Sequence, residues 1–312
     1  MRALVTGAAG FVGTNLVRRL LADGHEVTAA VRRDTDRWRL DGLAGELEID
    51  ELDVRDGAAV ATVVTRAKPE VVFHLATRGA YSWQTEPREI LEANVLGTSN
   101  VIEACRQAKV RALVNTGSSS EYGFKDHAPA ETEPLEPGSV YGVAKAAATL
   151  LCSVAAQLHG MPVATLRLYS VYGPYEEPGR FVPALVEAAL RGRLPVLASP
   201  TVARDFVWVG DVVEAYLRAA AAPGVGAVYN VGSGRQTTLA QAVDAARRVL
   251  GVSEEPSWSS MGDRPWDTEV WVADVSKIER ELGWRPAVEF DEGLARTAEW
   301  LRDDPAMRRR YA

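Results

Sequence analysis

The first thirteen residues, MRALVTGAAGFVG, contain the pattern that most restricts how this chain can fold. Residues 3–5 predict a short buried strand, residues 6–13 form a turn with three glycines, and an apolar helix follows through Leu21. Glycine permits a tight turn and a close backbone approach to phosphate groups, while a helix N-terminus offers free N–H groups and a positive dipole. A strand, a glycine turn and a helix in this order predict a cradle for the pyrophosphate of a dinucleotide rather than a purely structural turn.

The rest of the first half of the chain alternates strand-like apolar runs with helical patterns. Such alternation predicts an α/β fold, a Rossmann-type doubly wound parallel sheet with helices on both faces. The later strands are expected at 27–31, 71–75, 112–116 and 163–168, and the helices near 56–67, 89–108 and 141–159.

The rhythm changes after Gly173, where prolines become frequent. We expect residues 1–173 to form a dinucleotide-binding domain, with segments near 204–233 returning to it. Residues 174–203 and 234–312 would form a smaller, mostly C-terminal substrate lobe. The stretches expected to rejoin the sheet are 205–209 and 228–232.

Composition argues against several kinds of partner. The net charge of −7 speaks against a broad attraction to nucleic acid or to an anionic membrane, and no apolar run approaches transmembrane length. A strand that starts at residue 3 would leave no room for a signal peptide, so we expect a cytoplasmic protein. Cys105 and Cys152 lie in apolar helical patterns typical of reduced core thiols, and the four histidines lack metal-ligand spacing, so no bound metal is expected.

The second expected strand ends in Val31-Arg32-Arg33, without the acidic residue that usually bonds the adenosine ribose of NAD. Two guanidinium groups suit a 2′-phosphate, so Arg32 and Arg33 favour NADP, with NAD as the alternative. They also fit an ordinary solvated strand end. Asp53, after the third apolar run, is a candidate for holding the adenine amino group or for capping a helix.

Tyr141 and Lys145 lie one helical turn apart on the same face of an expected helix. The cation stabilises a phenolate and lowers the pKa of the tyrosine, so that Tyr141 can exchange a proton with a hydroxyl near neutral pH. The serines of GSSSEYG (117–123) follow a strand, and the carboxyl ends of strands face the ligand crevice in this kind of sheet. One of these hydroxyls is therefore a candidate to bridge a substrate oxygen and Tyr141, although such a cluster is equally typical of a plain loop.

Together these motifs resemble the extended short-chain dehydrogenase/reductases, which are nucleotide-sugar epimerases, dehydratases and reductases. The resemblance extends from residue 1 to about residue 300, and its motifs occur in the family's order. The opening segment, Arg32 and GSSSEYG are most similar to the 4-keto-6-deoxy-mannose reductases that act on GDP-sugars, and are also similar to the GDP-mannose dehydratases. The segments that carry the resemblance are 6–13, His74-Leu-Ala76, Asn94 in NVLGT, 118–120, Tyr141-xxx-Lys145 and Arg204-Asp-Phe.

The resemblance implies a role for each matching residue. Tyr141 would be the acid/base, Lys145 would also hold the nicotinamide ribose, and Ser119, or alternatively Ser118, would orient the substrate oxygen. Ser170 departs from the family pattern, which usually has Asn at this place near the substrate phosphates. The residues expected to line the cofactor are Gly7, Gly10, Phe11, Val12, Gly13, Arg32, Arg33, Asp53, Val54, Leu75, Ala76 and Thr77, and those expected to contact a nucleotide-sugar are Ser118, Ser119, Glu121, Ser170, Arg204 and Arg264.

The resemblance implies NADP-dependent oxidoreduction at C4 of a nucleotide-linked hexose, with reduction of a 4-keto sugar as the leading prediction. The alternative is 4-epimerisation with a tightly held cofactor. A 4,6-dehydratase is the third possibility, with Glu121 as its candidate additional acid/base. A non-catalytic cofactor-binding regulator is disfavoured by the intact Ser–Tyr–Lys set.

The resemblance also implies a homodimer through a four-helix contact. The apolar stripes expected to form it comprise Val95, Ile102 and Cys105 on one helix, and Ala144, Ala148, Leu151, Cys152 and Ala155 on the other. The alternative is that both stripes face only the sheet.

Overall fold

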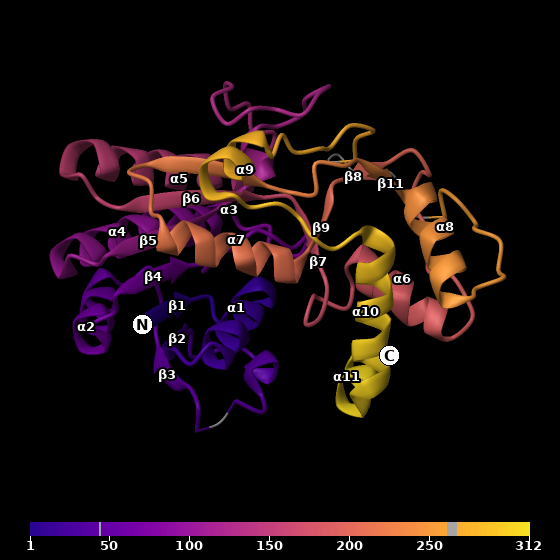
Figure 1. Ribbon diagram of the computed structural model, residues 1–312, viewed down its shortest axis with the longest axis horizontal. Helices are drawn as coiled ribbons and strands as arrows, with labels where there is room; N and C mark the ends of the chain where they lie inside the picture. The colour runs from indigo at the N-terminus through magenta and orange to yellow at the C-terminus, as the bar shows by residue number, and fades with distance from the viewer. Residues whose placement is uncertain (44, 261–266) are drawn as a thin grey trace.

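A seven-stranded parallel sheet forms the centre of the computed structural model, which describes residues 1–43, 45–260 and 267–312. Its strand order, β10-β6-β5-β4-β1-β2-β3, reverses direction at β1 and β4, as in a doubly wound sheet (Figure 1). The α/β fold expected from the sequence is therefore confirmed. The strands are β1 (Arg2–Thr6), β2 (Glu26–Val31), β3 (Glu48–Glu51), β4 (Val71–His74), β5 (Ala112–Ser118), β6 (Val163–Leu168) and β10 (Ala227–Val231).

Helices cover both faces of this sheet. On one face, α1 (Phe11–Ala22) and α7 (Val209–Ala221) bury their apolar sides in one core, in which Leu16 and Tyr216 are fully buried. The helices of the other face are α2 (Gly57–Ala67), α4 (Gly97–Ala108) and α5 (Val140–His159). Cys105 and Cys152 belong to this second core and are free, buried thiols.

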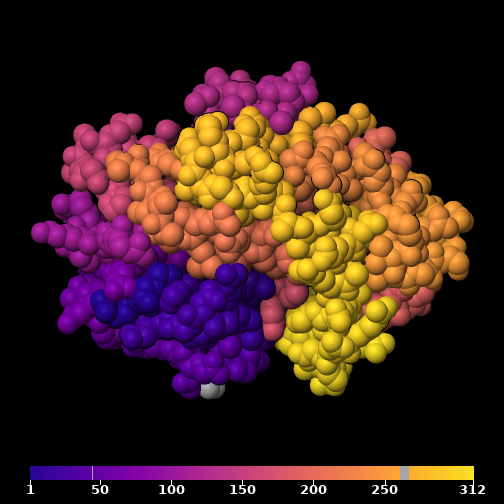
Figure 2. Space-filling view, viewed as in Figure 1, coloured from indigo at the N-terminus to yellow at the C-terminus, as the bar shows by residue number. Residues whose placement is uncertain are grey.

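The second lobe has its own core, formed mainly by α6 (Phe181–Leu190), α8 (Leu239–Leu250) and α10 (Phe290–Asp303). After α10, the short helix α11 (Pro305–Tyr311) brings the C-terminus back to the N-terminal part of the chain. Figure 2 shows these C-terminal helices in yellow beside the indigo N-terminal residues. The contact includes Tyr311, whose ring packs edge-on against Trp38 at 6.4 Å.

The two segments expected to return to the sheet behave differently. β10 joins the sheet beside β6, as predicted. β9 (Phe206–Trp208) instead pairs with β7 (Ser170–Tyr172) in a separate two-stranded sheet, so the prediction for 205–209 was wrong. Because β10 already occupies the edge beside β6, β9 pairs with the chain that continues beyond β6.

Helix α5 is apolar on two sides. Its length and composition would suit a membrane span, but half of that stretch is buried inside the protein. The residues expected to form a dimer contact mostly face the core: Ala144, Ala148, Cys152, Cys105 and Ile102 are all buried. Their burial agrees with the alternative in which these stripes face only the sheet. The apolar side chains that α5 exposes are Val140, Val143, Leu150, Val154 and Leu158.

Candidate active site

The glycine turn between β1 and α1 has the geometry of a phosphate cradle. Gly7 has a φ of +69°, and a Cβ there would lie 2.6 Å from the backbone N of Ala76. A Cβ on Gly13 would lie 2.2 Å from the carbonyl oxygen of Gly7, so the turn closes only with glycine at both places. Gly10 is the N-cap of α1 and has no side chain to cap it, which leaves the first helical N–H groups, at Phe11 and Val12, for an anion. The chain therefore fits a bound pyrophosphate here.

The residues expected around the adenine lie at the carboxyl end of β3. The Asp53 carboxylate accepts a 2.6 Å hydrogen bond from Arg55 Nη2, and this bond holds the pKa of Asp53 below its usual value. Val54 is buried against α4, where a Cβ on Gly97 would lie 2.6 Å from Val54 Cγ2. Val54 thus fixes the distance between α4 and this loop, and the Asp53 carboxylate is held by Arg55.

The two arginines after β2 have different surroundings. Arg33 Nε donates to Glu51 Oε2 at 3.2 Å, and both side chains are exposed. Arg32 is also exposed, and its charge adds to the effect of Arg55 in lowering the pKa of Asp53. Arg32 therefore faces the loop expected to bind the adenosine, whereas Arg33 is drawn toward the edge strand.

The segment after β4 connects the predicted cofactor site to Tyr141. Leu75 is buried, Ala76 is partly buried, and Thr77 Oγ1 donates to Asn94 Oδ1 at 2.9 Å. Asn94 lies in a π-helical turn (Glu92–Leu96) and also bonds the backbone N–H and carbonyl of Arg78. It therefore fixes the loop after β4, which carries Thr77 to the phenol.

His74 is a buried core residue with both ring nitrogens paired. Its Nδ1 lies 2.7 Å from Thr6 Oγ1 and its Nε2 lies 3.1 Å from Thr98 Oγ1. Burial, with a smaller contribution from Lys145, lowers the pKa of His74 to about 3, so the ring is neutral.

Tyr141 and Lys145 lie in the first turns of α5, whose N-cap Ser139 accepts a hydrogen bond from Gly142 N. Burial raises the pKa of the Tyr141 phenol, and hydrogen bonds between the phenol and the side chains of Ser118 and Thr77 oppose that effect. Lys145 is only 3% exposed, and burial lowers its pKa to about 8, with Glu121 opposing that effect. The structure thus places the Ser118 side chain at the Tyr141 phenol, with Lys145 one turn further along the same helix.

The serine that meets the phenol is Ser118, the sequence alternative, and not Ser119. Ser118 is the last residue of β5 and the N-cap of a short 3-10 helix, η3 (Ser119–Glu121), so its side chain projects from the strand end. Ser119 is already inside the helical turn and is buried. The tight approach of α5 to this turn depends on Gly142, since a Cβ there would lie 2.6 Å from the carbonyl oxygen of Ser120.

Glu121 does not face a substrate site, contrary to the sequence prediction. It is fully buried, its Oε1 accepts a hydrogen bond from the backbone N–H of Ser118 at 2.8 Å, and its Oε2 accepts one from Arg167 Nε at 2.8 Å. The capping box of η3 turns this side chain back toward its own N-cap, which explains the difference. Arg167, on β6, is a functional neighbour that the sequence reasoning missed.

The residues expected to contact a nucleotide-sugar lie on different elements of the structure. Ser170 is partly buried on β7, and its N–H donates to the carbonyl of Asp205. Arg204 is paired with Asp267 at 2.9 Å, on the second lobe. Arg264 lies outside the described residues.

Sequence reasoning did not select Arg180, which acts on the phenol, or its neighbour Glu176. Arg180, just before α6, favours the ionised form of Tyr141, and its Nε lies 3.6 Å from Glu176 Oε1. Glu176 is buried, and its Oε2 has no hydrogen-bond partner among the described residues. The sequence signal was the cluster of charges in YEEPGR (175–180), within a proline-rich stretch.

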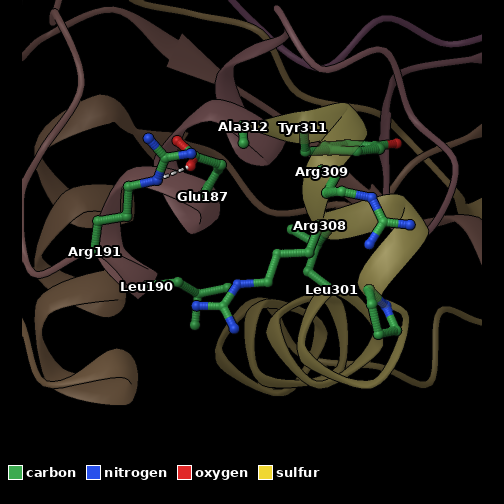
Figure 3. Close-up of a pocket in the computed structure, with 9 residues that line it drawn as sticks. Glu187, Leu190, Arg191, Leu301, Arg308, Arg309, Tyr311 and Ala312 are labelled. Atoms are coloured by element: carbon green, nitrogen blue, oxygen red, sulfur yellow. Dashed lines mark ion pairs between the residues drawn. The ribbon is translucent and has the colours of Figure 1, made fainter.

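A separate pocket of about 360 Å³ lies between α6, α10 and α11. Figure 3 shows three arginines around it, of which Arg191 is paired with Glu187. None of the predicted site residues that the structure describes lines this pocket.

Comparison with known proteins agrees with this geometry. The model of the NAD dependent epimerase/dehydratase family matches residues 3–232. A UDP-glucose 4-epimerase of Mycolicibacterium smegmatis is 34% identical, over 97% of this chain and 99% of its own length. A dTDP-glucose 4,6-dehydratase of Xanthomonas campestris pv. campestris is 30% identical, over 95% of this chain and 92% of its own length. The solved structure of MoeE5 with UDP-glucose and NAD is 34% identical, with a TM-score of 0.85 over 97% of this chain and 99% of that one.

The family match covers the whole sheet, and the relatives span nearly the full chain. The glycine cradle and the Ser–Tyr–Lys group lie within the matched residues. This chain is therefore an enzyme of the NAD dependent epimerase/dehydratase family, related to enzymes that act on nucleotide-sugars.

Proposed function

We propose that this protein is a nucleotide-sugar 4-epimerase that acts on a UDP-linked hexose. The observation that carries the proposal is the Ser118–Tyr141–Lys145 group in a chain 34% identical, over nearly its whole length, to a UDP-glucose 4-epimerase. This was the alternative from the sequence, and the relatives favour it over reduction of a 4-keto sugar.

The residues of the site can perform the required proton transfers. A nicotinamide dinucleotide held by the glycine turn would supply reversible hydride transfer at C4. Tyr141 would take the proton of the O4 hydroxyl and later return it, and Ser118 would hydrogen-bond the same oxygen. Lys145 would stabilise the phenolate by its charge, since both are held on one face of α5.

The surroundings of Glu121 argue against a 4,6-dehydratase. That reaction needs a further group to remove the C5 proton, and Glu121 was the sequence candidate. Its two carboxylate oxygens accept bonds from Ser118 N–H and from Arg167, and the side chain is 0% exposed. A carboxylate sequestered in this way cannot reach a sugar carbon.

Reduction of a 4-keto sugar is the second candidate, and Arg32 favours it. A reductase consumes its cofactor and commonly uses NADP, for which an exposed arginine after β2 is suited. Relatives of known structure contain NAD. We propose that this chain accepts both dinucleotides and that Arg32 gives NADP the advantage.

We also propose that two copies of this chain pair through α5. The exposed residues Val143, Leu150, Val154 and Leu158 are separated by seven, four and four residues, which is two, one and one helical turns, and so form one stripe along the helix. Leu158 is 72% exposed, and a contiguous stripe of exposed apolar side chains is unusual on the surface of a monomer. Burying the stripe against its own copy would cover it.

A product assay tests the proposed reaction. Purified protein is incubated with UDP-glucose and, separately, with UDP-galactose, and the nucleotide-sugars are separated by chromatography. We expect both reactions to reach the same mixture without net loss of cofactor. Failure to form an epimer from either sugar, together with NADPH oxidation by a 4-keto-6-deoxy nucleotide-sugar, would replace the epimerase by the reductase.

A further inference from the structure

A buried ion pair lies directly beneath the Ser–Tyr–Lys group. Glu121 and Arg167 are 0% and 3% exposed, and Glu121 Oε2 and Arg167 Nε are 2.8 Å apart. The protein has made room for this pair, since a Cβ on Gly117 would lie 2.7 Å from Glu121 Oε1 and 3.1 Å from Arg167 Cγ. Burying two charges costs free energy that a pair of apolar side chains would not require, so stability alone does not explain the pair.

The pair is oriented by contacts on both sides. On the catalytic side, Glu121 Oε1 accepts the backbone N–H of Ser118, whose hydroxyl meets the Tyr141 phenol. On the far side, Arg167 Nη1 donates to Tyr122 Oη at 2.8 Å, and Tyr122 donates to Asn230 Oδ1 at 2.7 Å. The negative end therefore points toward the catalytic group, and the positive end is anchored in β10.

We propose that Glu121, held by Arg167, is a positioning residue that fixes Ser118 against Tyr141 and places a negative charge beneath Lys145. This inference rests on the proposed roles of Ser118, Tyr141 and Lys145. It gives Glu121 a part in every reaction of this catalytic group, in place of the direct sugar contact expected from the sequence.

The charge of Glu121 acts on two partners. It favours the protonated form of Lys145, against the burial that lowers the pKa of this ammonium, and it disfavours the ionised form of Tyr141. The other groups that act on Lys145 are Cys152 on the same helix and the neutral His74 on β4, and those that act on Tyr141 are Ser118, Thr77 and Arg180. Loss of the Glu121 charge would therefore lower the pKa of both Lys145 and Tyr141.

The predicted direction of these pKa shifts gives a test that separates the effect of the Glu121 charge from the effect of its packing. Three proteins are compared: wild type, Glu121→Gln, and the double variant Glu121→Gln with Arg167→Met. The single variant leaves Arg167 unopposed, and the double variant removes both charges. The two limbs of the pH profile of turnover are followed, which report the coupled titration of Tyr141 and Lys145. We expect both to lie at the highest pH in wild type, lower in the double variant and lowest in Glu121→Gln, with a total displacement of about one pH unit.

A second measurement does not depend on the reaction. Tyrosinate absorbance is followed against pH for each protein and for the same protein with Tyr141→Phe, so that the difference reports the Tyr141 phenol. The same order of midpoints is expected. If this order appears while no nucleotide-sugar reacts, the positioning role stands and the proposed function fails.

Glu136→Gln is the matched control, because that carboxylate is exposed and pairs with Lys125. It should leave both limbs and the Tyr141 midpoint unchanged. If the single variant does not fold, the double variant decides between the outcomes. Variants that lose turnover equally at every pH, with midpoints at the wild-type values, would overturn the proposal and leave the ion pair a purely structural role.

Discussion

Gly142 lies directly against the carbonyl of Ser120, where a Cβ would come within 2.6 Å of the oxygen. This contact sets how closely the first turn of α5, with Tyr141, approaches the serine turn after β5. Gly142→Ala should therefore push Tyr141 away from Ser118. We expect the fold to survive and turnover to fall by about 10²-fold, the usual effect of a misplacement near 1 Å. The exposed neighbour Val143→Ala is the control, and equal turnover of the two variants would contradict this account.

We propose that Arg32 determines the choice between NADP and NAD. We expect calorimetric titration to give tighter binding of NADP than of NAD, because the exposed guanidinium can bond a 2′-phosphate. Arg32→Asp should reverse the order. Arg33→Asp, at the arginine paired with Glu51, should have a smaller effect. Tighter binding of NAD by wild type would show that the arginines form an ordinary strand end.

The exposed stripe on α5 should control the oligomeric state. Leu150→Glu places a charge in the middle of the stripe, so we expect light scattering to change from a dimer mass to a monomer mass. Val196→Glu, at a similarly exposed apolar residue after α6, is the control and should leave the mass unchanged. A monomer mass for wild type at micromolar concentration would rule out a stable α5 contact.

Glu176 should make folding stability depend on pH. Burial raises its pKa from 4.5 to about 8, so between these values the unfolded chain loses a proton that the folded protein keeps. Stability from this group is therefore present below pH 4.5 and is lost as the pH rises toward 8, by about 1.4 kcal/mol per pH unit at most. Urea unfolding at pH 5 and pH 8 should show that the free energy of unfolding of Glu176→Gln, relative to wild type, is higher at pH 8 than at pH 5.

The exposed Glu299→Gln on α10 is the control for this measurement and should show no such trend. A constant difference between Glu176→Gln and wild type at both pH values would mean that Glu176 ionises normally in the folded protein.

The sequence predicted the parts of the site that depend on local geometry. The glycine turn and the placement of Tyr141 and Lys145 one turn apart on a helix each follow from spacing. The choice between Ser118 and Ser119 did not follow, because it depends on where β5 ends and the capping box begins. The other features of the site depend on contacts between residues that are far apart in the chain.

Glu121 illustrates what spacing cannot provide. Its partner Arg167 is 46 residues away on β6, and only the parallel register of β5 and β6 brings the two together. The faces of α5 could not be told apart for a similar reason. Both sides of the helix are apolar, so the sequence pattern alone does not identify the side that the sheet covers. β9 was misplaced because pairing with a sheet edge depends on which strand already occupies it.

The fate of the hydrogen at C4 shows whether this protein epimerises a UDP-hexose by reversible hydride transfer. Purified protein is incubated with UDP-glucose that carries deuterium at C4, in ordinary water, and the recovered UDP-galactose is analysed by mass spectrometry and NMR. The account predicts that galactose retains deuterium at C4 with no net change in cofactor, and that Tyr141→Phe slows this conversion by roughly 10²–10⁴-fold. UDP-galactose that has lost its deuterium to solvent, or no epimer from either UDP-hexose, would contradict it.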